Sequence, residues 1–276
     1  MFELPECVTL TRQMNETLRG KTVQHGRLGN SPHKFVWYNR KPAEFERLTK
    51  GKTVGSAVAR GRWMLVPLEP DYMLVLGECG GRLLYHEPGA DLPGKYHLLL
   101  EFEDKSALSV TTQMWGAMEL FEKGREQERK YIKGMRYTPV GKEFTFAYFT
   151  RLVDELVEGE KRSVKGLLTQ EQLIPGLGNS VAQDIMFRAG LHPRHLLTEL
   201  SPAQRRALHE AIIRTVREVI VKGGRSDELD LLGRPGRYER IMSSKTAGKP
   251  CPECGAKIQK IAYLGGACYV CPTCQQ

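Results

Sequence analysis

The sequence predicts an α+β protein of several domains: an N-terminal antiparallel β-sandwich or barrel with a leading helix, a helical domain, and a C-terminal zinc ribbon. Short apolar runs broken by Gly, Pro, Asp and Asn fill residues 21–119, a texture typical of antiparallel strands. Apolar residues recur at helical spacing from about residue 140, and two Cys-Pro-x-Cys turns lie near the end of the chain. At 276 residues, the chain is long enough for two domains and a ribbon.

The chain opens with residues that suit a short amphipathic helix. Pro5 and Glu6 are favourable in a first helical turn, and Gly20 marks the expected end. The apolar residues between them recur at helical spacing: Cys7, Leu10, Met14 and Leu18. Strands are then expected in three apolar runs, at residues 63–66, 72–76 and 97–102.

A helical domain is expected from about residue 140, after a basic connector at residues 123–136. Its first helix face is marked by residues at i, i+3, i+4, i+7 and i+8: Phe149, Leu152, Val153, Leu156 and Val157. A last long helix is expected from Ser201 and Pro202, a cap followed by proline at the first helical position, to Gly223.

Within this domain, residues 173–182 contain a Pro-Gly-Leu-Gly-Asn turn. Gly176 and Gly178 allow a backbone turn that side chains would block, and Asn179 is expected to cap the next helix. A helix N-terminus with tightly turned amides is a phosphate-binding site. A plain connector between two helices is the alternative, which the turn by itself favours.

Four cysteines near the C-terminus have the spacing of a zinc ribbon: Cys251, Cys254, Cys271 and Cys274. Each Cys-Pro-x-Cys turn points two sulfurs at one tetrahedral centre, which predicts one structural Zn²⁺. Disulfides or unrelated thiols are the alternative interpretation. Cys268, three residues before Cys271, is an alternative ligand.

The net charge indicates which binding partners to expect, and the cysteine content indicates the cellular compartment. A net charge of +9 predicts attraction to polyanions, with nucleic acid as the leading partner and a basic surface without a dedicated ligand as the alternative. Isolated Cys7 and Cys79 beside a thiolate metal site fit a reducing cytosol. Neither a signal peptide nor a membrane-spanning run is recognisable. We therefore expect a soluble cytoplasmic monomer with no membrane partner.

Three segments together resemble the Fpg/Nei DNA glycosylases, the family of formamidopyrimidine-DNA glycosylase and endonuclease VIII. Residues 172–193 are similar to their helix-two-turns-helix motif, Glu-Leu-Pro-Glu at residues 3–6 to their N-terminal Pro-Glu-Leu-Pro-Glu, and the ribbon to their zinc finger. The resemblance covers essentially the whole chain. It predicts a glycosylase-like β-sandwich, a helix-two-turns-helix domain, a linker and a finger, at residues 1–135, 136–226, 227–248 and 249–276.

This resemblance implies binding of damaged or abasic duplex DNA in a basic cleft between the first two domains. It also implies excision of oxidised bases and cleavage of the abasic strand. In the family, the amine of an N-terminal proline attacks the sugar C1′ to form a Schiff base, and the neighbouring glutamate assists proton transfer. The lesion is flipped out of the base stack, and side chains fill the gap.

The N-terminal residues depart from the family pattern. Phe2 stands where the family has proline. A large second residue blocks removal of the initiator methionine, so the reactive amine is expected on Met1, or on Phe2 if Met1 is removed. Glu3 matches the catalytic glutamate, although an acid there is also ordinary first-turn helix chemistry.

Several DNA-contacting positions also differ. Arg62 stands where many members have a phosphate-binding lysine, a solvated strand charge being the alternative. Glu78 replaces an apolar wedge, and Gly266 replaces the arginine of the finger. Trp115 retains an aromatic ring at its position. It is expected either to stack on a base or to be a buried strand tryptophan.

The sequence leaves two main functions open. One is a DNA glycosylase and abasic-site lyase that uses an atypical amine. The other is a non-catalytic binder of damaged DNA or of structured DNA or RNA. A zinc-stabilised protein-protein adaptor is a third hypothesis, which leaves the basic charge and the Gly-Asn turn unexplained.

Overall fold

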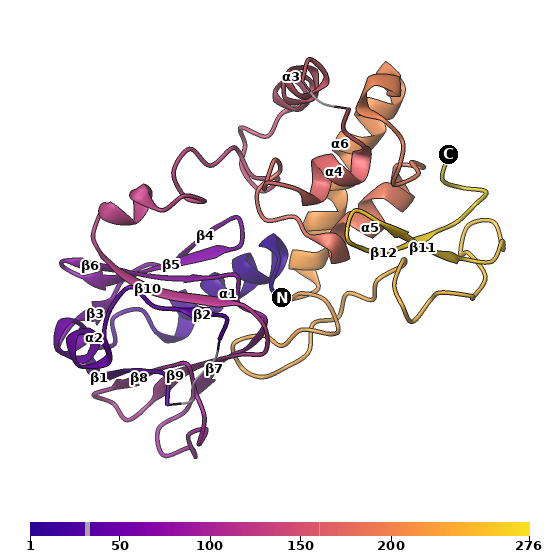
Figure 1. Cartoon of the computed structure of the whole chain (residues 1–276). Coiled ribbons are helices and arrows are strands. Elements are labelled where there is room, and N and C mark those ends of the chain that lie inside the picture. Colours follow the sequence, from indigo (N-terminus) through magenta and orange to yellow (C-terminus); the bar gives the residue numbers. More distant parts are fainter. Residues whose placement is uncertain (31–33, 160) are drawn as a thin grey trace. The chain divides into compact units, whose positions relative to one another are not determined.

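The computed structural model describes residues 1–30, 34–159 and 161–276. The chain forms two compact units (Figure 1). The first unit contains Met1–Met135 and Lys222–Tyr238, and the second contains Arg136–Val221 and Glu239–Gln276. Within the described residues, no helix has both the length and the apolar composition needed to cross a membrane.

Two β-sheets form the body of the first unit, and Figure 1 shows them as separate layers. The four-stranded sheet has the order β1 (Val23–Leu28), β8 (Leu98–Phe102), β9 (Ala107–Thr112), β7 (Gly81–His86). The six-stranded sheet has the order β2 (Val36–Trp37), β10 (Gly116–Glu122), β6 (Tyr72–Gly77), β5 (Trp63–Glu69), β3 (Thr53–Val54), with β4 (Val58–Arg60) also paired to β5. Of these strand pairs only β2–β10 is parallel.

One hydrophobic core lies between these sheets. It takes buried side chains from both, including Leu98, Leu100 and Val110 of the four-stranded sheet and Val66 and Leu76 of the six-stranded one. Helix α1 (Leu4–Thr17) adds its apolar face to the same core through Cys7, Leu10 and Met14. The predicted sandwich with a leading helix is confirmed.

A short helix, α2 (Pro42–Thr49), which was not predicted, lies within the strand-rich region. Pro42 occupies the first helical turn, and Phe45 lies buried in the core. The sequence pattern does not reveal this helix, because two helical turns contain too few apolar residues to display a 3.6-residue period. A 3₁₀ turn, η1 (Arg125–Glu128), follows β10.

Residues 222–238 return from the second half of the sequence to pack on the first unit, and Figure 1 shows them beside β7. The N–H of Tyr85 on β7 donates to the carbonyl of Leu231 over 2.8 Å. Gln13 of α1 accepts from the N–H of Leu231 and donates to Asp230, both over 2.9 Å. Leu231 is buried in the core. This segment, which we call the return loop, is thereby fixed against α1 and β7.

The second unit is mainly helical. Its helices are α3 (Phe146–Val157), α4 (Val164–Thr169), α5 (Asn179–Arg188) and α6 (Pro202–Val221), with a 3₁₀ turn η2 (Leu197–Glu199). The hydroxyl of Ser201 accepts from the N–H of Gln204 at 3.3 Å, which confirms the predicted cap of the last helix. A hairpin of β11 (Gln259–Tyr263) and β12 (Gly266–Val270) completes the unit.

The turn before α5 differs from its prediction. Gly178, and not Asn179, is the residue before the helix, and a glycine has no side chain with which to cap it. Gly176 has a φ of 89°, which favours glycine, whereas Gly178 has an extended φ of −138° that any residue can adopt. Asn179 is instead the first helical residue, and its amide donates to the carbonyl of Ala267 in β12 at 3.3 Å. A long-range contact therefore replaces the expected local cap.

Candidate functional site

Phe2 anchors the N-terminus in the first unit. Its side chain is 1% exposed and belongs to the core. Its backbone N–H donates to the carbonyl of Cys79 at 2.9 Å. This nitrogen is an amide of the chain, because Met1 precedes it. Burial of the ring in the core thus accommodates a large residue at position 2.

Met1 is held at both ends by the return loop. Its α-amine lies 2.8 Å from Oε1 of Glu228, and its carbonyl accepts from Nη2 of Arg225 at 2.9 Å. The amine therefore has a defined position, although the Met1 side chain is partly exposed.

A pocket of about 300 Å³ opens beside this amine. Met1 lines it together with residues from the start of β7 and the residue before it, the loop before β10 and the return loop: Gly80, Gly81, Arg82, Gln113, Met114, Asp227, Glu228 and Leu229. Glycines at residues 80 and 81 bring the backbone close, since a Cβ on Gly80 would lie 3.2 Å from Cα of Met1. The pocket thus combines a primary amine with both acidic and basic side chains.

Arg225 is the buried centre of the charge network around Met1. Its side chain is 2% exposed and lies 3.0 Å from Glu6, 3.3 Å from Glu228 and 3.8 Å from Glu3. Burial alone would lower the pKa of Arg225, but the carboxylates of Glu6 and Glu3 raise it above its usual value. A guanidinium in this environment remains charged and joins α1 to the return loop.

Glu3 is engaged in helix capping. Its carboxylate accepts from the backbone N–H of Glu6, and the carboxylate of Glu6 accepts from the N–H of Glu3 at 2.9 Å, which together form a capping box. Glu3 is buried. These contacts correspond to the first-turn role that the sequence also allowed.

Arg62 and Glu78 contact each other. Arg62 lies in the turn between β4 and β5, and its Nη1 is 3.5 Å from Oε2 of Glu78. The same nitrogen lies 3.8 Å from the sulfur of Met1. Arg62 is therefore close to the N-terminus and is partly neutralised by Glu78.

Trp115 is neither buried nor in a strand. It precedes β10 and is 38% exposed, so the interpretation as a buried strand tryptophan is wrong. Its ring stacks on Trp37 with centroids 5.2 Å apart and packs against Phe35 at 4.7 Å. Met114, next to it, lines the pocket. An exposed aromatic cluster thus borders the N-terminal pocket.

The second unit contains the predicted cysteine cluster. The sulfurs of Cys251, Cys254, Cys271 and Cys274 all lie within 4.8 Å of one another, a set that can hold one metal ion. Burial raises the pKa of Cys271, but the backbone N–H groups of Cys274 and Thr273 lower it to about 7. Cys268 is buried on β12, outside the cluster. The alternative with Cys268 as a ligand is therefore not supported.

The hairpin next to this cluster is fixed to the helices of the second unit. Leu264 and Gly265 form its two-residue turn, both with positive φ. The ammonium of buried Lys165, on α4, donates to the carbonyl of Tyr263. A Cβ on Gly266 would lie 3.7 Å from this nitrogen and 3.9 Å from Oδ1 of Asn179. Gly266 therefore lies beside the Gly-Asn turn, although it has no side chain to extend.

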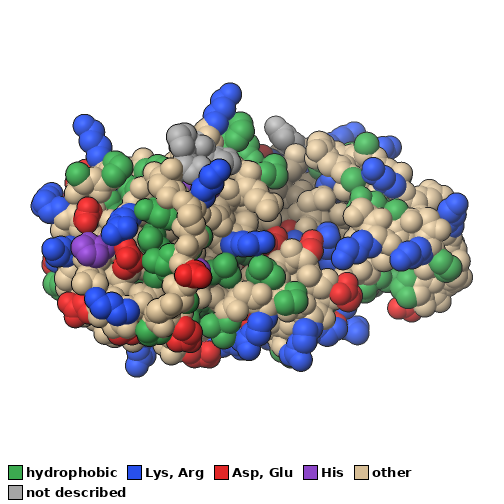
Figure 2. All heavy atoms as spheres, turned by 90° about the horizontal axis from the view of Figure 1, so that it is seen from below, with side chains coloured by type: hydrophobic (Ala, Val, Ile, Leu, Met, Phe, Trp, Pro, Cys, Tyr) green, Lys and Arg blue, Asp and Glu red, His purple; other side chains and the backbone are tan. Residues whose placement is uncertain are grey.

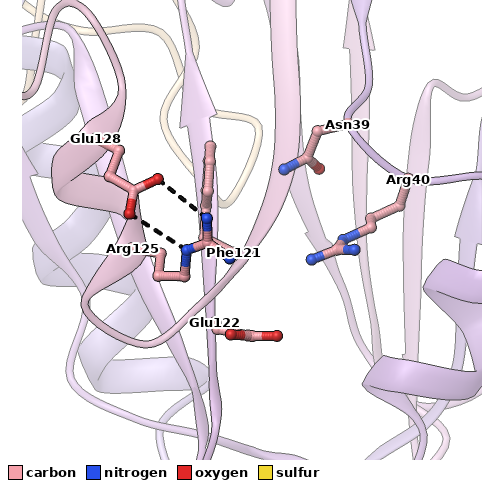
Figure 3. A pocket seen from close by; sticks show the side chains of 6 residues that line it. All are labelled: Asn39, Arg40, Phe121, Glu122, Arg125 and Glu128. Atoms are coloured by element: carbon pink, nitrogen blue, oxygen red, sulfur yellow. Dashed lines mark hydrogen bonds and ion pairs between the residues drawn. The ribbon is translucent and has the colours of Figure 1, made fainter.

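A second pocket, of about 230 Å³, lies beside β10 and η1 in the first unit (Figure 3). Its two arginines already have partners. Arg125 points toward Glu128 in Figure 3 and pairs with it at 3.3 Å, and Arg40 pairs with Glu44 at 2.9 Å. The pocket beside Met1 is the better candidate site, because a primary amine, which can act as a nucleophile, lines it, whereas none of the described residues lining this second pocket carries one.

Sequence patterns identified only part of these sites. Arg225, Glu228 and Lys165 were missed, because each acquires its role through contacts with residues about 100 or more positions away. The one available signal was the charge density after Gly223 and Gly224. Basic side chains are also spread over the surface, and Figure 2 shows Lys and Arg side chains with Asp and Glu among them.

Comparison with known proteins agrees with this architecture. The model of the formamidopyrimidine-DNA glycosylase N-terminal domain matches residues 1–140, and that of the formamidopyrimidine-DNA glycosylase H2TH domain matches residues 137–229. The formamidopyrimidine-DNA glycosylases of Bacillus licheniformis and Gluconobacter oxydans are 29% and 28% identical, with all of each chain covered.

Solved structures of the Lactococcus lactis enzyme, Fpg, have the same fold. Its complex with DNA that contains an abasic site is 26% identical, with a TM-score of 0.85 and 99% of both chains covered. A complex of a point mutant of that enzyme with Fapy-dG DNA has a TM-score of 0.87 at 24% identity, again over 99% of both chains. With matching domain models over residues 1–229 and the same fold over the whole length, this chain belongs to the Fpg/Nei family of DNA glycosylases.

Proposed function

We propose that this protein binds damaged or abasic duplex DNA. The observation that carries the proposal is the full-length similarity to a Lactococcus lactis Fpg whose solved complex contains abasic-site DNA. We assign DNA contacts to Arg62 and Trp115 in the first unit and to Gly178 and Asn179 in the second. The exposure of Trp115 supports a stacking role, a contact worth ~1–3 kcal/mol per base.

Fluorescence anisotropy tests this proposal. We expect tighter binding to a duplex with a stable abasic-site analogue than to the matched undamaged duplex. Trp115→Ala should weaken binding by roughly 5- to 160-fold, as the loss of one stacked base predicts. Val221→Ala, an exposed apolar change at the end of α6, is the control. Equal affinity for both duplexes would contradict recognition of the abasic site, and preference for structured RNA would support the alternative nucleic-acid partner.

We also infer that the cysteine cluster binds one structural Zn²⁺. Four thiolates in a closed tetrahedral set are typical of structural zinc. Cys274→Ser should release the metal and loosen residues 250–276, whereas Cys268→Ser should retain one zinc per chain. Elemental analysis of both purified variants is the measurement. Equal zinc content in the two variants would contradict the assignment of Cys274.

A second candidate function is cleavage at abasic sites through an N-terminal amine. It is favoured by one observation, the position of the Met1 amine in the wall of a pocket. Borohydride trapping on abasic-site DNA, followed by mass mapping of the N-terminal peptide, tests it. An adduct on Met1 would support a lyase. Tight, salt-sensitive binding without an adduct would support a non-catalytic DNA-binding protein.

A further inference from the structure

The carboxylate nearest the terminal amine comes from the return loop, which lies far from the N-terminal motif in sequence. We propose that Glu228 accepts the proton of the Met1 α-amine when this amine attacks an aldehyde, and that Arg225 positions both groups. Glu3 has a structural role in this proposal. The inference rests on the proposed function, because the expected aldehyde is the ring-opened sugar of an abasic site.

The contacts of the two glutamates distinguish their roles. Oε1 of Glu228 lies 2.8 Å from the amine nitrogen, within the range for direct proton transfer. Glu228 also lines the pocket in which an aldehyde would lie. The carboxylate of Glu3 instead accepts from the backbone of Glu6 and lies beside Arg225.

Arg225 fixes the geometry of the pair. One of its nitrogens, Nη2, lies 2.9 Å from the carbonyl of Met1 and 3.3 Å from Oε1 of Glu228. The same side chain is held by Glu6 at 3.0 Å. The nucleophile and its proton acceptor are therefore both fixed to one buried guanidinium. Such fixed geometry is what lowers the entropic cost of a reaction between two groups.

The chemistry balances without any further reagent. Glu228 takes one proton from the ammonium, and the freed lone pair forms a bond to the aldehyde carbon while the carbonyl oxygen receives a proton from the nitrogen. The resulting carbinolamine loses its hydroxyl as water after Glu228 returns its proton. The products are an iminium ion, one water molecule and the original carboxylate.

The pocket fits a small polar aldehyde. Its volume of about 300 Å³ is at the lower end for ligand pockets. Arg82 lines it and offers a cation to a phosphate, and the polar side chain of Gln113 also lines it. An abasic deoxyribose carries an aldehyde, hydroxyl oxygens and phosphates, so its chemistry matches this lining.

Single-turnover borohydride trapping on an abasic duplex tests the role of Glu228. We expect Glu228→Gln to slow adduct formation by about 100-fold or more, the usual size of a general-base contribution. Glu228→Asp should recover part of the rate. Both variants should keep the wild-type melting temperature, and their DNA affinity should lie within about twofold of wild type. The side-chain carbonyl of glutamine can still accept a hydrogen bond from Arg225. Glu103→Gln, an exposed change in the first unit, is the matched control.

Two outcomes would overturn the proposal. The first is trapping by Glu228→Gln at the wild-type rate. The second is a larger loss in Glu3→Gln than in Glu228→Gln at equal melting temperature, which would return proton transfer to Glu3. For Arg225→Lys, we expect slower trapping without a change in DNA affinity, as a positioning role requires.

A DNA-free probe separates this inference from the proposed function. Wild-type protein incubated with 2-deoxyribose 5-phosphate and cyanoborohydride should gain one adduct on Met1, located by intact mass and peptide mapping. Glu228→Gln should react at least tenfold more slowly. If both proteins bind abasic DNA normally and react with the small aldehyde at the same rate, the role of Glu228 as proton acceptor is refuted and DNA recognition stands. If Glu228→Gln reacts more slowly but neither protein prefers abasic DNA, only DNA recognition is refuted.

Discussion

At the scale of single residues, a buried arginine organises the N-terminus. Arg225 lies within 3.8 Å of three carboxylates and also donates to the carbonyl of Met1. Burying one cation among acids is costly unless every charge is compensated. The N-terminus of this chain is therefore positioned by electrostatics from the return loop as well as by the burial of Phe2.

Replacing Arg225 by alanine should strongly destabilise the first unit. Glu6 and Glu3 would remain buried without their cation, a loss of about 3–5 kcal/mol for breaking a buried pair. Chemical denaturation of the purified variant is the measurement. Arg234→Ala is the control: its side chain is 65% exposed and pairs with Asp230, so the expected change is within about 1 kcal/mol. Similar effects in both variants would contradict the central role of Arg225.

An exposed pair near β9 predicts a pH dependence. Hydrogen bonds from Lys21 and Ser106 hold the pKa of Asp104 at about 2, below its ordinary value of about 3.9. The resulting stabilisation is present above the unfolded pKa and is lost as the pH falls through the folded pKa. Asp104→Asn should therefore be slightly less stable than wild type at pH 7, by less than about 1 kcal/mol because solvent screens the pair.

The measurement is a pair of denaturation curves across the pH range. The two proteins should converge in stability as the pH approaches 2. A difference that stays constant from pH 7 to pH 2 would show that the hydrogen bonds of Asp104 do not depend on its charge.

At the scale of elements, strand pairing determines which side chains can be accommodated at each position. Gly77 of β6 lies opposite Trp63 of β5. A Cβ at Gly77 would lie 1.7 Å from the buried indole, so the ring or the strand would have to move. Cross-strand packing, and not turn geometry, is the reason for glycine at this position.

Gly77→Ala should destabilise the first unit by roughly 1–3 kcal/mol, as overpacking in a core does. Gly94→Ala is a matched control, because no atom of the described residues lies within 4 Å of the position that its Cβ would take. Thermal unfolding of both variants compares them directly. A wild-type melting temperature for Gly77→Ala would mean that Trp63 relaxes without cost.

The helices also differ in how well the sequence predicts them. The helix at residues 4–17 was predicted because its first-turn residues and its apolar period agree locally. The helix at residues 42–49 was missed because it is short, and Phe45 is specified by the core and not by a periodic pattern. The side chain of Asn179 donates to a carbonyl on β12 and does not cap its own helix. Local helix propensity does not predict such a long-range contact.

At the scale of the whole molecule, net charge predicts the salt dependence of DNA binding. A charge of +9 favours release of counterions from DNA. The logarithm of the binding constant should fall linearly with the logarithm of salt concentration for abasic and undamaged duplexes alike. Anisotropy titrations between low and physiological salt measure the slope. A salt-independent affinity would contradict phosphate contacts as the main source of binding.

The sequence by itself determined the fold class, the four-cysteine cluster and the family, because each depends on local spacing or on motifs that recur in order. Tertiary structure alone decided how the N-terminus is held. Met1 and Glu228 are 227 positions apart, and their contact exists only because residues 222–238 return to pack on α1 and β7. Charged residues in a glycine-rich stretch carry no periodic signal, so their partners become known only when folding brings them together.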